Sequence, residues 1–256
     1  GAYGFLPRFI NGEQITYVVG DASHAYQAHE LSSKKRKDNT PDDLKVKHFR
    51  RHYLLLKPKL FVVYDEMEAH KPVDWSWLIH NFHGLKLNAE NKTVETTYKD
   101  RGGRLTLFGG AVLDYSVTDK YSVAPKNFLR KEDPDGNLLN YQNHWHFKAS
   151  TQKKQNKMRF LAIIQVSEDL NYELVQSSKN NDEIEVGDWI IKANLDTNTP
   201  AMISLENKDG SVQFYSNVPD EGGIAKLVEE VDGKKSIKTA EDNYPKSIIS
   251  AAKRFK

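Results

Sequence analysis

The stretch RRHYLLLKPKLFVVYDEMEAHKPVDWSWLIHN, residues 50–81, decides the fold class. Two apolar runs in it, 53–56 and 60–64, flank Lys57-Pro58-Lys59, a break that predicts a turn between two strands. Both runs are too apolar to alternate, so we expect both faces of these strands to be covered. The side chains expected inside are Leu54, Leu56, Phe61 and Val63.

The end of the same stretch has the two-residue period of a strand. Trp75 and Trp77 fall on one face of it, while Leu78 and His80 fall on the other. We therefore expect the tryptophan face to belong to the core.

Short β-branched or aromatic runs recur along the rest of the chain, separated by turn signals such as Lys208-Asp-Gly210. The runs are 14–20, 53–56, 60–64, 74–80, 93–98, 105–108, 145–149, 159–164, 185–192, 201–205 and 211–215. This pattern predicts an all-β fold, an antiparallel two-layer β-sandwich followed by a smaller C-terminal β domain.

A polar gap at 166–182 is the best candidate for a domain boundary. We place the boundary near residue 168, which assigns 1–167 to the sandwich and 168–256 to the smaller domain. Helical periodicity is convincing only at 244–255, where Pro245 would lie near the helix start. Two polar stretches, 32–43 and 131–137, are expected to be exposed loops.

Composition excludes several classes of function. The 256 residues carry a net charge of +2, too small to imply a nucleic-acid partner, and no apolar run reaches the length that spans a bilayer. There is no cysteine, so disulfides and thiolate chemistry are excluded. The opening GAYGFLPRF shows no export signal, and fits a segment that follows a cleaved signal or lies inside a longer protein.

Polar residues offer several candidate sites, each with a structural alternative. His80 with His83, and His144 with His146, have spacings from which two imidazoles can bind a metal. No further ligand completes either set, so a structural role is favoured for His80 and His83 and a solvent- or glycan-facing pair for His144 and His146, and we predict no metal or cofactor in this chain. Asp65-Glu66 closes an apolar run and is expected to cap a turn, with ligand or catalytic roles as the alternatives.

The run Arg50-Arg51-His52 precedes a strand that we expect to be buried. Guanidinium groups there could hold a carboxylate or sulfate by bidentate hydrogen bonds, although a surface pair flanking a strand is the alternative. The familiar motifs of hydrolases, nucleotide-binding loops and zinc proteases are absent from the sequence.

Five segments, in this order and spacing, resemble the C-terminal β portion of the heparinase II/III-like polysaccharide lyases. They lie within residues 15–166 and are VVGDASHAY at 18–26, HYLLLKPKLFVVYD at 52–65, WSWLIH at 75–80, WHFKA at 145–149 and FLAII at 160–164. The resemblance implies an N-terminal α-helical toroid, a central β-sandwich and a small C-terminal β domain in a longer, periplasmic or extracellular parent protein. It also implies an acidic polysaccharide as substrate, cleaved by β-elimination at a uronic acid.

In that family the Tyr, His and Asn groups assigned to catalysis lie on the toroid and on the first strands of the sandwich. A His/Asp/His metal set occurs in some members, so the resemblance allows a zinc or calcium ion in the full-length parent. Only 17 residues precede Val18 here, and we therefore expect this chain alone to be inactive.

For the chain itself, the resemblance implies one wall of the glycan cleft. The substrate-binding residues assigned to that wall are His24, Tyr26, Arg50, Arg51 and His52. No residue is assigned to catalysis, with His80 the one weak candidate. The alternative function is a non-catalytic carbohydrate-binding or structural β module, since a sandwich fold by itself does not specify an activity.

Overall fold

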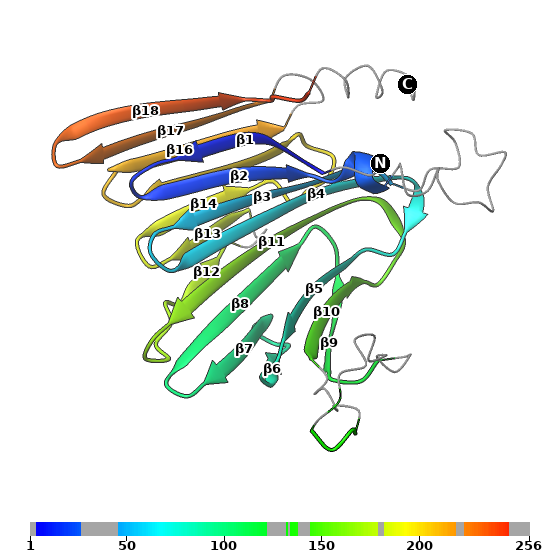
Figure 1. The fold of residues 1–256 in the computed structure, drawn as a ribbon. Helices are drawn as coiled ribbons and strands as arrows, with labels where there is room; N and C mark the ends of the chain where they lie inside the picture. Colours follow the sequence, from blue (N-terminus) through cyan, green and yellow to red (C-terminus); the bar gives the residue numbers. More distant parts are fainter. Residues whose placement is uncertain are drawn as a thin grey trace.

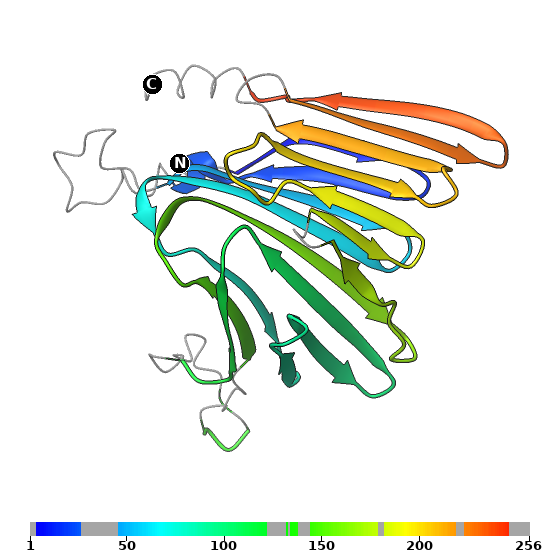
Figure 2. The same cartoon turned by 180° about the vertical axis from the view of Figure 1, so that it is seen from behind.

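The computed structural model describes residues 4–26, 46–121, 132, 134–137, 144–178, 182–218 and 223–245. Eighteen antiparallel strands in these ranges form three sheets, which we call the large, small and C-terminal sheets (Figures 1 and 2). The all-β class and the antiparallel sandwich predicted from the sequence are confirmed. No helix within the described ranges is long and apolar enough to span a membrane.

The large sheet has eight strands, in the order β1-β2-β3-β4-β11-β8-β7-β6. Their bounds are β1 Phe5–Asn11, β2 Ile15–Asp21, β3 Val46–Leu56, β4 Leu60–Val73, β6 Leu85–Asn88, β7 Thr93–Tyr98, β8 Arg101–Gly109 and β11 Gln155–Ser167. The small sheet has the order β5-β10-β9, with β5 Ser76–Asn81, β9 Leu113–Thr118 and β10 Trp145–Thr151.

The C-terminal sheet is a meander of seven strands in sequence order. Its strands are β12 Val175–Ser177, β13 Glu183–Val186, β14 Trp189–Ala193, β15 Ala201–Asn207, β16 Val212–Val218, β17 Ile224–Val231 and β18 Lys234–Glu241. The chain passes from the large sheet to this sheet after β11, close to the predicted boundary at residue 168. That the two parts are separate domains stays a prediction.

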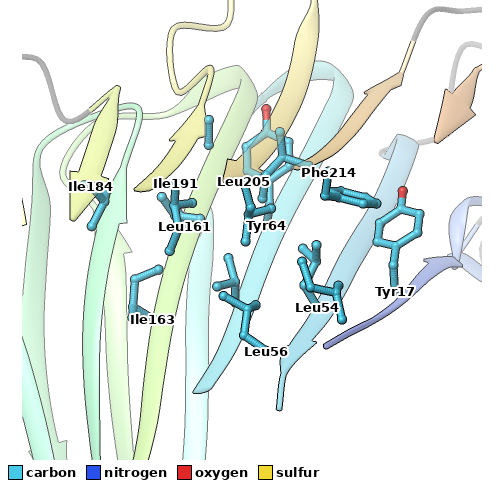
Figure 3. Packing of buried hydrophobic residues seen from close by; sticks show 14 of the residues in the cluster. Tyr17, Leu54, Leu56, Tyr64, Leu161, Ile163, Ile184, Ile191, Leu205 and Phe214 are labelled. Atoms are coloured by element: carbon cyan, nitrogen blue, oxygen red, sulfur yellow. The ribbon is translucent and has the colours of Figure 1, made fainter. Parts of the chain in front are cut away.

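The large sheet is the middle layer of the molecule, because each of its faces lines a different core. Alternation along β4 shows this directly: Val62 and Tyr64 pack toward the C-terminal sheet, while Val63 packs toward the small sheet. Figure 3 shows the first core, where Tyr64 and Leu161 of the large sheet meet Ile191, Leu205 and Phe214 of the C-terminal sheet.

The second core lies between the large and small sheets. Trp75 and Trp77 are buried in it, as predicted, and Leu78 on the opposite face is 47% exposed. Val63 is buried in the same core, while Leu54 and Leu56 are buried in the first core, all three as expected. The small sheet therefore covers part of one face of the large sheet. The sequence shows that this face is apolar but not what covers it.

Three predictions for the opening stretch are corrected. Phe61 is 39% exposed and Tyr53 is 43% exposed, since neither the small sheet nor the C-terminal sheet covers them. Asp65-Glu66 does not cap a turn but lies in the middle of β4, where the partners of these carboxylates are on neighbouring strands. The turn at Lys57-Pro58-Lys59 is confirmed.

Residues 134–137 form an exposed turn, as expected. The predicted loop at 32–43 lies outside the described residues, as does the predicted helix beyond Pro245.

Two buried charged side chains join the N-terminal hairpin to the C-terminal sheet. Glu229 on β17 accepts hydrogen bonds from the backbone N–H groups of Glu13, Gln14 and Ile15, at 2.9, 2.8 and 3.0 Å. Arg8 on β1 donates to the Ser216 hydroxyl of β16 and to the Asp242 carboxylate that follows β18. Such charge-assisted hydrogen bonds are stronger than those between neutral groups, so they fix how the hairpin sits on the sheet.

Candidate functional site

A polar cluster lies where β2 ends and β3 begins. A single helical turn, residues 23–26, follows β2. The backbone N–H of Ser23 donates to Asp21 Oδ1 at 2.9 Å, and the Ser23 hydroxyl accepts from the backbone N–H of Phe49 at 2.9 Å. These two bonds hold the turn against the ends of both strands.

Asp21, Arg50 and Tyr244 form the centre of this cluster. Arg50 lies opposite Asp21 in the β2–β3 register and donates from Nε to Asp21 Oδ2 at 3.0 Å, while the Tyr244 hydroxyl donates to the same oxygen at 2.7 Å. Burial alone would raise the pKa of Asp21, but the Arg50 charge and the Tyr244 hydrogen bond lower it below its usual value. The carboxylate is therefore ionised and fixes the guanidinium in place.

The two terminal nitrogens of Arg50 are the groups of this cluster that are available to a ligand. Nη1 and Nη2 have no hydrogen-bond partner among the described residues, and the side chain is 12% exposed. The guanidinium also lies 6.0 Å from the centre of the Tyr244 ring. A fixed guanidinium with free terminal nitrogens is a good donor pair for a carboxylate or sulfate oxygen.

A contact between a histidine and a carboxylate lies beside the Asp21–Arg50 ion pair. His48 Nε2 contacts Glu66 Oε1, and Glu66 lies opposite Arg50 in the β3–β4 register. Both side chains are partly buried, at 22% and 16% exposure. The end of the large sheet therefore carries alternating acidic and basic groups.

Aromatic rings surround this end of the sheet. The Phe5 ring lies 6.0 Å from the ring of His24 and 6.1 Å from that of Tyr244. Tyr26 is 45% exposed and packs on Phe49 at 5.2 Å. Of the residues predicted to bind substrate, the structure thus brings His24 and Arg50 together around Phe5 and Tyr244, with Tyr26 nearby on Phe49.

Arg51 points away from this cluster, because adjacent residues of a strand face opposite sides of a sheet. It makes a bidentate pair with Asp65, whose side chain is 1% exposed, and its guanidinium lies 5.8 Å from the Trp77 ring. Burial works against the charged form, but the hydrogen bond and charge of Asp65 outweigh it and raise the pKa of Arg51. Arg51 is therefore part of the edge of the second core.

His52 is fully buried between the large and C-terminal sheets, so its assignment to a substrate surface is corrected. Its Nδ1 lies 2.9 Å from the Tyr17 hydroxyl, which also contacts the Ser216 hydroxyl at 2.7 Å. Burial, followed by the charges of Arg8 and Arg50, holds the pKa of His52 well below its usual value. A neutral, buried imidazole has no surface to offer a glycan.

The other predicted histidines lie on the small sheet and next to it. His80 pairs with His146 across β5 and β10, with ring centres 5.7 Å apart, while His83 stacks on Tyr98 at 4.3 Å. His80 is thus on a different sheet from Asp21 and Arg50. Among the described residues, the one acid or base in contact with it is the His146 ring.

The described residues do not fit a metal ion. No three histidine, aspartate or glutamate side chains among them group closely enough to bind one. Both oxygens of Asp21 already accept hydrogen bonds. The expectation of no metal in this chain stays a prediction.

Sequence reasoning missed Asp21 and Tyr244 as parts of the cluster. Asp21 stands in the quoted segment VVGDASHAY, next to His24 and Tyr26, and that proximity was the available signal. Tyr244 gives no signal, because it lies 223 positions from Asp21 in the chain.

Comparison with known proteins gives a likeness of fold. No family model and no curated protein matches the chain. A heparinase III superposes with a TM-score of 0.51 at 11% identity, over 93% of this chain and 27% of its own. The heparan sulfate lyase HepC from Pedobacter heparinus gives a TM-score of 0.48 at 11% identity, over 84% of this chain and 28% of its own.

The chain thus spans about a quarter of the length of these proteins. At such low identity the likeness concerns architecture and carries over no residue roles. In fold, the chain is similar to the β-sandwich portion of a heparinase III.

Proposed function

We propose that this chain is the β-sandwich part of a polysaccharide lyase that cleaves uronic-acid-containing glycans by β-elimination. The observation that carries the proposal is the likeness to a heparinase III over 93% of the chain. In this proposal an N-terminal toroid of the same protein supplies the opposite wall of the cleft, and the protein acts in the periplasm or outside the cell. The ligand is an acidic polysaccharide of the heparin or heparan sulfate kind.

In β-elimination a base removes the proton at C5 of the uronate, negative charge moves onto the carboxylate, and the C4–O bond breaks as an acid protonates the leaving oxygen, which leaves a C4=C5 double bond. The reaction needs a cation or hydrogen-bond donors near that carboxylate, because the charge on its oxygens grows in the transition state. Arg50 fits this requirement, since Asp21 and Tyr244 fix it and its terminal nitrogens are free among the described residues. The base and acid are proposed to lie outside this chain.

The test is an elimination assay with the full-length protein on heparan sulfate, heparin and alginate. Elimination creates an unsaturated product that is followed by its ultraviolet absorbance. We expect turnover by the full-length protein and none by the 256-residue chain alone. Absence of turnover by the full-length protein on every uronate glycan would reject the proposal.

Replacing Arg50 with glutamine in the full-length protein is expected to lower kcat/KM about tenfold, because a charge-assisted hydrogen bond to the substrate carboxylate is lost. Arg101→Gln is the matched control, since Arg101 is exposed on β8 of the same sheet. Circular dichroism of both variants checks that each remains folded. Equal activity of the two variants would exclude Arg50 from the cleft wall.

A non-catalytic carbohydrate-binding module is the second candidate. It is favoured by the exposed rings on the small sheet, such as Phe82 at 58% exposure. The two candidates are distinguished by the sequence of the full-length protein, because helical repeats before this chain support the lyase. Their absence supports the module.

A further inference from the structure

The outward face of the small sheet carries a cluster of rings that the proposed cleft wall does not use. The strand register places outward side chains in rows, with His146 between His80 and Thr118, and Lys148 between Leu78 and Ser116. Just beyond the strand ends, Phe82 meets His144, and Tyr121 follows β9. We call this surface the ring face, which consists of Leu78, His80, Phe82, Tyr121, His144, His146 and Lys148.

The rings of this face touch one another and remain open to solvent. The centres of Phe82 and His144 are 3.8 Å apart, and those of Tyr121 and His146 are 4.8 Å apart. Phe82 is 58% exposed and Tyr121 is 38% exposed. Leu78, in the next row, is 47% exposed, so the apolar surface continues along the sheet.

Lysine and histidine side chains lie beside the rings. Lys148 is exposed beside Leu78, and Nδ1 of His146 is buried without a hydrogen-bond partner in the part of the chain that the structure describes. The outward-facing carboxylate of these strands, Asp114, lies at the far end of β9 and accepts a hydrogen bond from Gln152. Asp119 and Lys120, which lie between β9 and Tyr121, carry one charge of each sign, so the unbalanced charge near the rings is that of Lys148.

We propose that the ring face binds an acidic glycan chain. The C–H faces of pyranose rings pack on exposed aromatic rings, as ligands do in apolar sites with a few placed polar groups. Lys148 and the imidazoles donate hydrogen bonds to carboxylate or sulfate oxygens. The choice of an acidic glycan rests on the proposed function, while the ring face itself is a separate surface from the cluster around Arg50.

Single-stranded nucleic acid also stacks on aromatic rings, but it requires a basic groove that follows its phosphates. The outward side chains of β5, β9 and β10 include one lysine and form no such groove, whereas a glycan can pack its pyranose rings on the aromatic side chains and place one carboxylate or sulfate beside Lys148. Titration with a short single-stranded oligonucleotide therefore tests whether the ring face binds an acidic glycan in preference to nucleic acid.

The experiment is calorimetric titration of the 256-residue chain with a heparan sulfate oligosaccharide of defined length, with neutral dextran and a single-stranded DNA oligonucleotide as comparison ligands. Phe82→Ala is expected to weaken oligosaccharide binding roughly tenfold, as loss of a stacking partner does. Lys148→Gln is expected to weaken it and to reduce its dependence on salt.

The matched controls are Tyr215→Ala and Lys226→Gln. These residues pair across β16 and β17, and both are exposed on the C-terminal sheet, where Tyr215 is 42% exposed. Unchanged binding in both controls, with the losses above, supports the ring face. Equal losses in variants and controls, equal binding of DNA, or no oligosaccharide binding by the native chain would each overturn it.

These results are separable from those of the elimination assay. If Phe82→Ala loses binding while the full-length protein eliminates nothing, the ring face stands and the lyase proposal fails. If the full-length protein eliminates but binding by the chain does not depend on Phe82, the lyase proposal stands and the ring face fails.

Discussion

Replacing Arg8 with methionine is expected to lower the free energy of unfolding by about 3–5 kcal/mol, because the change leaves the largely buried Asp242 carboxylate without its counter-charge and removes the hydrogen bonds to Ser216 and Asn217. The Arg8 side chain is 1% exposed and lies between the large and C-terminal sheets. Its Nε donates to Asp242 at 2.6 Å, while Nη1 donates to the Ser216 hydroxyl at 2.9 Å and to the Asn217 carbonyl at 2.6 Å. Methionine fills similar space but donates none of these bonds.

Denaturation in urea, followed by circular dichroism, measures this loss. The control is Lys192→Met, which removes ion pairs to Glu183 and Glu206 on the exposed face of the C-terminal sheet, where all three side chains are 44–45% exposed. Surface pairs of this kind contribute about 0–1 kcal/mol. Losses of the same size in the two variants would contradict the role assigned to Arg8.

The second large effect concerns pH. The folded protein holds His52 neutral, since burial and the charges of Arg8 and Arg50 lower its pKa. The unfolded chain, in which the imidazole has its ordinary pKa of about 6.5, then binds more protons than the folded chain as the pH falls below that value. Stability is therefore lost toward acid, by up to about 1.4 kcal/mol per pH unit, or about 2 kcal/mol between pH 7.5 and pH 5.

Urea unfolding at a series of pH values compares the native protein with His52→Gln, which does not titrate at this position. The readout is the slope against pH, so a constant loss of stability in the variant does not disturb it. His70→Gln is the control, because His70 is exposed on β4. Equal slopes for the native protein and His52→Gln would show that His52 accepts a proton in the folded state.

The sequence was sufficient for the fold class, because the evidence for it is local. The two-residue period correctly assigned Trp77 to the core and Leu78 to the surface. The inference that a continuous apolar run is covered on both faces was wrong for Phe61, since exposure there depends on how far the small sheet extends over the large one. The run 185–192 was expected to form one strand. It is divided into β13 and β14, because Gly187, at a φ of 55°, makes a turn between them.

The candidate site was less accessible to sequence reasoning. Arg50, Arg51 and His52 were treated as one group, although the period of a strand separates Arg51 from the other two. Burial then separates His52 from Arg50, and it depends on the C-terminal sheet, which is formed by distant residues. Asp65 was misplaced for the same reason, because its partner Arg51 is on the neighbouring strand.

Glu229 joins two segments of the chain that are synthesised far apart in time. The turn between β1 and β2 gives its N–H groups to a carboxylate at least 214 positions later in the chain. On the ribosome, this hairpin emerges long before its partner exists, and pairings of such sequence separation are slow to form. The two strands of this hairpin are therefore among the last of the described strands to reach their final state, and until then their exposed edges favour pairing with other chains.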